Sequence, residues 1–227
     1  MQGLVSYTGI MDAIGSERRE TLQAKKQDVV RREIWNAAIE LFHEQGFDEV
    51  TVEQIASHAG VSYRTFFRYF SSKDDVMAST TKSYGTALVQ AIAAEGPAVS
   101  RLDVAKSAIK KVLVPDPLVT ERVLKIAERS RAARVAQFLE VPILEREIAA
   151  AFARREGDEA KAGMDERVLA SLALSATGIS AETWVAQQHR PIDEIIDEVF
   201  GAITAVCVDE KLVRAKPLRS SPLLRNR

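Results

Sequence analysis

The side chains best suited to recognising another molecule lie close together between residues 63 and 68. Tyr63, Arg64, Thr65 and Arg68 are all hydrogen-bond donors, and the two arginines carry a permanent positive charge. Guanidinium and hydroxyl groups donate to base edges and to phosphate oxygens. The pattern therefore indicates nucleic-acid binding rather than bond-making chemistry.

The stretch from Val50 to Phe70 has the pattern of two short helices joined by a tight turn. Thr51 is expected to be the N-cap of the first helix, with Gln54 completing a capping box. Gly60 lies where the chain must adopt a left-handed conformation, and Ser62 is placed to cap the second helix. This predicts a helix-turn-helix whose second helix enters the major groove of DNA. The alternative is an ordinary pair of packed helices with no role in DNA binding.

A helix from about Asp28 to Gln45 is expected to support this pair from behind. Its apolar residues recur at the period of an amphipathic helix and form one stripe: Ile34, Ala37, Ala38, Leu41 and Phe42. Trp35 and Ile39 lie off the stripe and are expected to contact the next domain. The aromatic residues expected to hold the second short helix from behind are Phe66, Phe67 and Phe70.

This order of elements resembles the N-terminal domain of the TetR family of transcriptional repressors. The resemblance runs from Ile34 to Val76, through IWNAAIELFHEQGF and VTVEQIASHAGVSYRTFFRYFSSKDDV. It implies a DNA-binding domain followed by a helical domain that forms a homodimer through its last two helices. One residue departs from the family pattern, because Phe67 stands where the family usually has Tyr. Phe cannot hydrogen-bond to a phosphate, so that contact is not carried over.

These features together predict the DNA contacts residue by residue. The N-terminal end of a recognition helix lies nearest the bases, which assigns Tyr63, Arg64 and Thr65 to the bases of double-stranded DNA. The residues expected to hold phosphates are Thr51, Ser62, Arg68, Tyr69 and Lys73, the last also supported by the resemblance. Two such helices in a homodimer would fit successive major grooves of a near-palindromic operator.

Composition sets limits on the class of protein. The chain has 227 residues, of which 46% are hydrophobic, and a formal net charge of −1. DNA binding must therefore come from local positive charge, because the molecule as a whole does not attract nucleic acid. A single cysteine excludes an intramolecular disulfide and fits the reducing cytoplasm, where we expect the protein to act. No membrane-spanning stretch and no secretory signal is expected.

The sequence predicts an all-α fold with an N-terminal three-helix helix-turn-helix domain and a C-terminal helical ligand-binding and dimerisation domain. The expected divisions are a flexible N-terminal arm (1–27), the helix-turn-helix DNA-binding domain (28–72), the helical effector-binding and dimerisation domain (73–210) and a basic flexible tail (211–227). Periodicity and helix-breaking residues predict the later helices at about 73–95, 101–114, 119–139, 142–156, 165–189 and 191–209. The basic segment 16–32 is either a solvated arm or a contact to the minor groove or phosphates.

The last two helices carry a continuous apolar face together with many small residues that allow close approach. We expect them to form a two-fold dimer interface. The alternative is that both helices merely bury their apolar faces in their own domain.

Residues with catalytic or metal-binding chemistry are sparse. The three histidines are far apart and have no second ligand at a metal-binding spacing, so no metal and no cofactor is expected. Glu145 and Glu147 point to different faces of their helix, which is unsuited to paired acid–base catalysis. No catalytic residue is assigned, and the protein is not expected to be an enzyme.

The second domain is expected to bind a small, largely apolar effector between its helices. The candidate residues are Arg131, Arg134, Phe138, Trp184 and Gln188, although the arginines could simply be solvated and Trp184 could be part of the core. A faint resemblance from Arg129 to Ile203 points to TetR-type regulators that respond to acyl-CoA or other apolar effectors. The rival hypothesis is a DNA-bound interaction protein whose second domain binds a protein partner.

Overall fold

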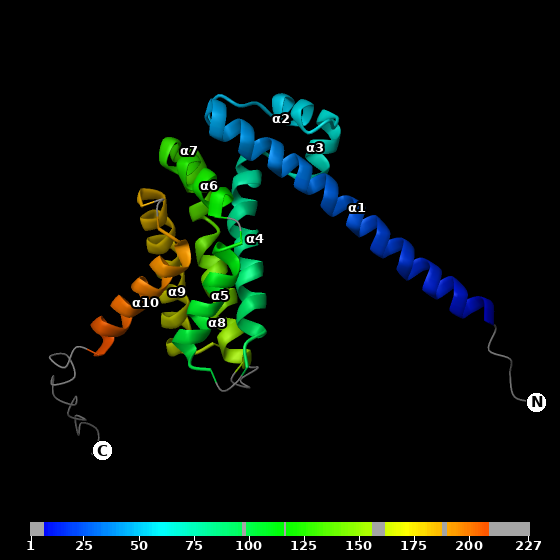
Figure 1. The fold of residues 1–227 in the computed structure, drawn as a ribbon. Coiled ribbons are helices and arrows are strands. Elements are labelled where there is room, and N and C mark those ends of the chain that lie inside the picture. Colours follow the sequence, from blue (N-terminus) through cyan, green and yellow to red (C-terminus); the bar gives the residue numbers. More distant parts are fainter. Residues whose placement is uncertain (1–6, 97–98, 116, 156–161, 188–189, 209–227) are drawn as a thin grey trace, which may run out of the picture. The chain divides into compact units, whose positions relative to one another are not determined.

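The computed structural model describes residues 7–96, 99–115, 117–155, 162–187 and 190–208, with side chains described from Lys26 to Val206 within these ranges. Every regular element in this part of the chain is a helix, as the sequence predicts (Figure 1). The helices are α1 (Tyr7–Gln45), α2 (Val52–His58), α3 (Tyr63–Tyr69), α4 (Lys73–Ala93), α5 (Arg101–Leu113), α6 (Pro117–Arg129), α7 (Arg131–Phe138), α8 (Val141–Arg155), α9 (Met164–Ala186) and α10 (Ile192–Val208). The basic tail expected at 211–227 lies outside the described residues.

The chain forms two compact units that are not consecutive in sequence. The first comprises residues 1–83 and 122–141, and the second comprises 84–121 and 142–227. The helix-turn-helix therefore shares its unit with the start of α4, the end of α6 and all of α7. Sequence patterns assigned all of these segments to the second domain, because such patterns do not show which apolar faces pack together when the residues are far apart in the chain.

The first unit is held together by a core beneath the helix-turn-helix. All five residues of the stripe predicted on α1 are buried, together with Phe47, Val50, Ile55 and Phe66. The segment 122–141 completes this core with Ile126, Ala133 and Ala136. Ile39, expected to lie off the stripe and contact another domain, is instead buried in this same core, to which α6 and α7 also contribute.

The helix α1 begins at Tyr7 rather than near Asp28, so residues 7–27 of the segment expected to be a flexible arm continue the helix. Residues 16–32 are rich in Glu, Arg, Lys, Gln and Ala, which favour helix even where no apolar stripe is present. Apolar periodicity identifies the buried part of a helix, but it cannot predict an exposed extension of the same helix.

A single helix expected at 119–139 is divided into α6 and α7 at Ser130. The Ser130 backbone is extended (φ −128°, ψ 121°), and its hydroxyl accepts a hydrogen bond from the Ala133 amide, so it caps α7. The same hydroxyl donates to Asp48 Oδ1 at 3.2 Å, a residue in the turn after α1. Ser130 is buried, so the break in the helix lies inside the unit rather than at its surface.

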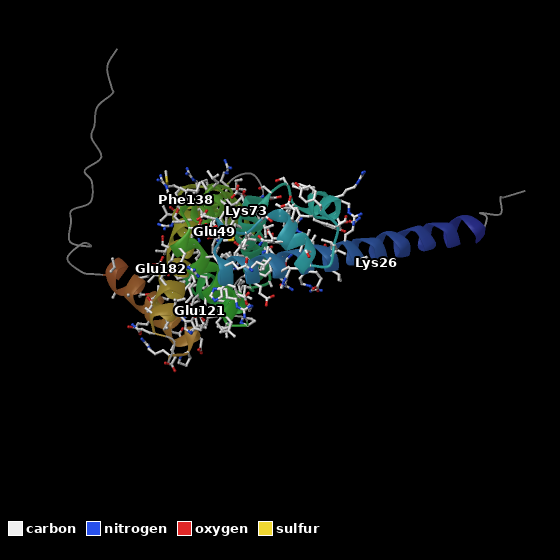
Figure 2. All side chains as sticks on the ribbon, turned by 90° about the horizontal axis from the view of Figure 1, so that it is seen from above. Lys26, Glu49, Lys73, Glu121, Phe138 and Glu182 are labelled. Carbon is white, nitrogen blue, oxygen red and sulfur yellow. The ribbon has the colours of Figure 1, made fainter. Side chains whose placement is uncertain are left out.

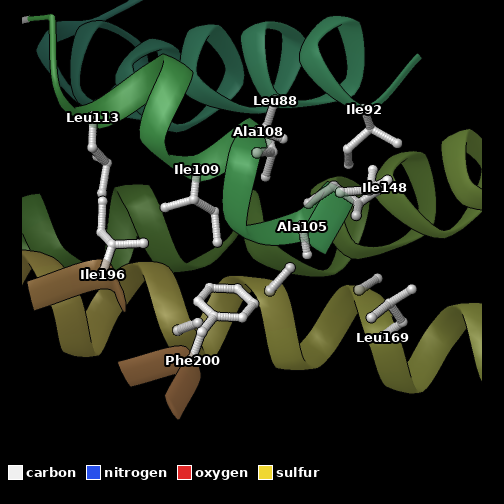
Figure 3. Close-up of a cluster of buried hydrophobic side chains, with 14 of the residues drawn as sticks. Leu88, Ile92, Ala105, Ala108, Ile109, Leu113, Ile148, Leu169, Ile196 and Phe200 are labelled. Carbon is white, nitrogen blue, oxygen red and sulfur yellow. The ribbon is translucent and has the colours of Figure 1, made fainter. Parts of the chain in front are cut away.

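The second unit packs α5 among α4, α8, α9 and α10 (Figure 3). Its core is aliphatic and alanine-rich: Leu88 and Ile92 meet Ile109, Ile148 and Phe200 with small residues between them. Small side chains bring the helix axes close together.

A glycine allows α4 and α8 to pack closely in this unit. A Cβ atom added at Gly85 would collide with the Leu144 side chain, so a larger residue here would force Leu144 to move. Gly85 is buried, and its role is to admit Leu144 rather than to relax the backbone.

By length and composition, α9 could cross a membrane, which contradicts the expectation that no stretch qualifies. One face of α9 lies in the core of the second unit, through Leu169, Ala173, Ala176 and Trp184. Packing inside a helical unit accounts for its apolar character.

Candidate DNA-binding surface

Hydrogen bonds at the helix starts fix the helix-turn-helix in place. Thr51 N donates to Gln54 Oε1 at 2.8 Å, and Gln54 N donates back to Thr51 Oγ1 at 3.3 Å, which is the predicted capping box. Thr65 N donates to Ser62 Oγ at 3.0 Å, which caps α3. Gly60 in the connecting turn has φ +66°, and this left-handed conformation is the one that glycine was predicted to supply.

The outer face of α3 is exposed and its inner face is buried. Phe66 is completely buried beneath the helix and Phe70 ends it from the same side, whereas Arg64 and Arg68 are exposed. Tyr63 is also exposed, with 51% of its surface accessible. A helix anchored on one side and free on the other is able to enter a groove without unfolding its own domain.

The sequence suggested that Phe67 holds the helix from behind, but the structure places it on the other side. It is 43% exposed and lies on the outer face, where its ring packs edge-on against Tyr63 with 4.8 Å between centroids. The helical period places residue 67 one turn after residue 63 and turns it by about 100° from the buried Phe66. Aromatic composition alone does not distinguish these two positions.

The remaining polar groups of α3 are ordered by their neighbours. Arg68 lies over the Tyr69 ring at 4.9 Å and donates from Nη2 to the Tyr69 hydroxyl at 3.0 Å. The hydroxyls of Ser62 and Thr65 lie 2.8 Å apart and form a hydrogen bond. These contacts limit rotamer freedom before any DNA is bound, which lowers the entropy lost on binding.

Lys73 has a different role from the phosphate contact predicted for it. Its ammonium donates to the carbonyl oxygens of Phe47 at 2.8 Å, Asp48 at 3.1 Å and Val50 at 3.1 Å. It also lies 4.8 Å from the centre of the Phe47 ring. An ammonium has three protons, and here three carbonyls accept them, so Lys73 (labelled in Figure 2) ties the α1–α2 turn to the start of α4.

The candidate effector residues are divided between the two units. Arg134 donates to the carbonyls of Ala127 and Glu128, which terminate α6, so it has a structural partner. Phe138 is 67% exposed at the end of α7 (Figure 2), and Trp184 is only 8% exposed in the core of the second unit. Gln188 lies outside the described residues.

Arg131 lines a groove of about 590 Å³ on the first unit. The groove is mainly apolar, through Val135, Ala136 and Leu139, and Asp48 and Asp74 also line it. A second groove, of about 490 Å³, lies on the other unit between α4 and α8, with Arg146 and Arg154 along its wall.

Sequence patterns did not single out a polar cluster in the core of the second unit. The Tyr84 hydroxyl donates to Thr177 Oγ1 at 2.7 Å, and Thr177 donates to the Ala173 carbonyl at 2.8 Å. Burial raises the pKa of Tyr84, which keeps its phenol protonated as a donor. Ser180, one turn further along α9, is fully buried, and its hydroxyl has no hydrogen-bond partner among the described residues. The sequence signal that could have indicated this cluster is the presence of Thr177 and Ser180 among the small apolar residues of α9.

Metal binding finds no support in the described part of the chain, where no group of three or more His, Cys, Asp or Glu side chains could hold an ion. His58 instead lies 3.1 Å from Glu40 at the surface of the first unit. His189 is outside the described residues.

Known proteins share both the motif and the fold. Residues 34–80 match the family model described as bacterial regulatory proteins, tetR family. The transcriptional regulator TcmR of Streptomyces glaucescens is 34% identical over 92 residues, which is 40% of this chain and 41% of that protein. The match thus spans less than half the length of TcmR.

Two further comparisons extend along most of the chain. The putative mycofactocin biosynthesis regulator MftR of Mycobacterium tuberculosis is 26% identical over 200 residues, covering 82% of this chain and 95% of that protein. The structure of FadR from Bacillus subtilis in complex with stearoyl-CoA has the same fold, with a TM-score of 0.53 and 20% identity over 75% of this chain and 95% of that one. With its capped helix-turn-helix and helical second unit, this chain is similar to bacterial transcriptional regulators of the TetR family, and the family match lies in residues 34–80.

Proposed function

We propose that this protein is a transcriptional repressor that binds a near-palindromic operator as a homodimer and is released by a small, largely apolar effector. The observation that carries the DNA-binding half is the outer face of α3, where Arg64 and Arg68 are exposed above a buried Phe66. Acting on DNA in this way places the protein in the cytoplasm.

In this proposal Tyr63, Arg64 and Thr65 lie nearest the bases, because they form the first turn of α3. Thr51, Ser62, Arg68 and Tyr69 contact phosphates on either side. Lys73 is left out of the contact set, because its protons are already donated to backbone carbonyls.

Dimerisation is proposed to use α9 and α10. Val168 and Ile179 are exposed on α9, and Val206 is exposed on α10, although the opposite faces of both helices are buried. Exposed Gly201 and Ala202 would let a second copy approach closely. Two recognition helices joined in this way would fit two half-sites about one helical turn of DNA apart.

The effector is proposed to bind in the second unit, near the cluster of Tyr84, Thr177 and Ser180. Apolar ligands are oriented by a few polar groups in an otherwise apolar site, and Ser180 offers an unused hydroxyl there. The stearoyl-CoA bound to Bacillus subtilis FadR makes long-chain acyl thioesters the first class to test. The arginines of the α4–α8 groove would suit an anionic head group.

A specific feature favours the rival function, a DNA-bound protein that recruits a protein partner. Val135, Phe138 and Leu139 are exposed large apolar side chains on and just after α7. An exposed apolar strip of this kind is typical of a protein-binding surface.

The experiment is selection of binding sites from a random duplex library by the full-length protein, followed by titration of the selected site. We expect a two-fold symmetric consensus and a dimer mass by light scattering. An Arg64→Ala, Arg68→Ala double variant of unchanged helicity is the matched control and should select nothing. Recovery of no consensus by the unmodified protein would refute the DNA-binding function.

The effector half is tested on the selected operator with stearoyl-CoA, stearate and free coenzyme A as probes. Release by stearoyl-CoA alone would support the acyl-thioester class. No change in operator affinity with any of the three would argue against that class. Binding of a partner protein to the operator-bound regulator, abolished by Phe138→Ser, would then favour the rival function.

A further inference from the structure

The exposed face of α3 is divided lengthwise into two strips of different chemistry. Successive helical residues are turned by about 100°, so Tyr63 and Phe67 lie one above the other, and Arg64 and Arg68 form the neighbouring row. All four side chains are exposed, whereas Phe66 on the other side is buried. The arginine strip suits phosphates and guanines, but Phe67 has no part in the contacts derived above.

Phe67 is a costly side chain to leave in water, and its position is well defined. Its ring packs edge-on against Tyr63 at 4.8 Å and against Phe66 at 5.3 Å. It has no hydrogen-bonding group, so neither a phosphate nor a polar base edge can be its partner. The group that covers Phe67 in a DNA complex must therefore be apolar.

The major groove offers one apolar group on its base edges, the C5-methyl of thymine. We propose that Phe67, with Tyr63 alongside it, recognises a thymine methyl at one fixed position in each half-site of the operator. This inference rests on the proposed DNA-binding function. Since Arg64 occupies the adjacent strip, the thymine lies next to the base pair that Arg64 contacts.

The test replaces each thymine of the selected operator in turn by deoxyuridine, which differs only by the missing methyl. The unmodified protein should lose about fourfold in affinity at one position per half-site, and about fifteenfold when both half-sites are changed, as expected for one buried methyl each. Phe67→Ala should bind more weakly and show no loss at that position. Phe67→Leu, which keeps an apolar side chain, should retain part of the preference for thymine.

Circular dichroism of each variant separates loss of recognition from loss of folding, and the deoxyuridine scan on the unmodified protein requires no variant at all. If Phe67→Ala weakens binding but no thymine-to-uracil change matters, Phe67 contacts the deoxyribose and the inference is overturned. It is also overturned if the uracil effect persists in Phe67→Ala. Failure to select any consensus would instead refute the proposed function on which the inference depends.

Discussion

Replacing Lys73 by methionine distinguishes a structural lysine from a DNA contact. Methionine keeps most of the apolar length of the side chain but removes the hydrogen bonds to the carbonyls of Phe47, Asp48 and Val50. One hydrogen bond from a charged donor contributes about 1.5–3 kcal/mol. The three bonds are not independent, because they share one ammonium, and the bond to the Asp48 carbonyl is exposed. We therefore expect the free energy of unfolding to fall by about 2–4 kcal/mol rather than by three times the single value.

The measurement is urea denaturation of full-length Lys73→Met followed by fluorescence. Lys82→Met on the same helix is the matched control, because Lys82 forms ion pairs with Asp75 and Glu140 at the surface and should cost at most about 1 kcal/mol. Lys73→Arg should recover little of the stability, since a planar guanidinium cannot direct its protons to three carbonyls around one point.

A salt titration of operator binding tests the alternative, in which Lys73 contacts a DNA phosphate. If Lys73 contacts a phosphate, its removal lowers the slope of log affinity against log salt by about 0.9 per subunit. We expect the slope to be unchanged when affinity is referred to folded protein. Unchanged stability together with a reduced slope would refute the structural role assigned to Lys73.

Three further substitutions test other parts of the structure. Arg64→Ala should weaken binding to the selected operator by about 1–3 kcal/mol if the guanidinium forks onto a guanine, and equal loss on random DNA in a competition titration would reassign it to the backbone. Gly85→Ala should destabilise the chain by about 1–3 kcal/mol through the collision with the Leu144 side chain, and thermal melts should show a smaller cost of the same change in a Leu144→Ala background. Thr177→Val should lower the free energy of unfolding by about 1–3 kcal/mol, because it leaves the Tyr84 hydroxyl without an acceptor. Tyr84→Phe should lower it by less, because Thr177 still donates to a carbonyl, and equal losses in urea denaturation would contradict this direction of donation.

Local features of the fold were predictable from the sequence because their causes are local. Thr51 with Gln54, Ser62, and the positive φ of Gly60 depend on residues a few positions apart, and each has the predicted geometry. The apolar stripe of α1 was predictable for the same reason, since its period is a property of one helix.

The features that sequence reasoning missed depend on contacts between distant segments. Ser130 looks like one polar residue among several, and only its burial against Asp48 makes it the point where two helices divide. Lys73 likewise reads as a surface cation until its carbonyl partners are known. Phe67 was misplaced for a different reason, because the short α3 has too few turns for its apolar pattern to identify the buried side.

The discontinuous first unit has a consequence for protein engineering. A chimera that joins the N-terminal segment of this chain to the C-terminal part of another regulator would need that segment to contain its whole core. Here a graft ending before α4 would leave behind Ile126, Ala133 and Ala136, which belong to the same buried core as Ile39. A functional transplant of this operator specificity must carry residues 122–141 as a second insert, or exchange only the exposed side chains of α3 and keep the recipient's own interior.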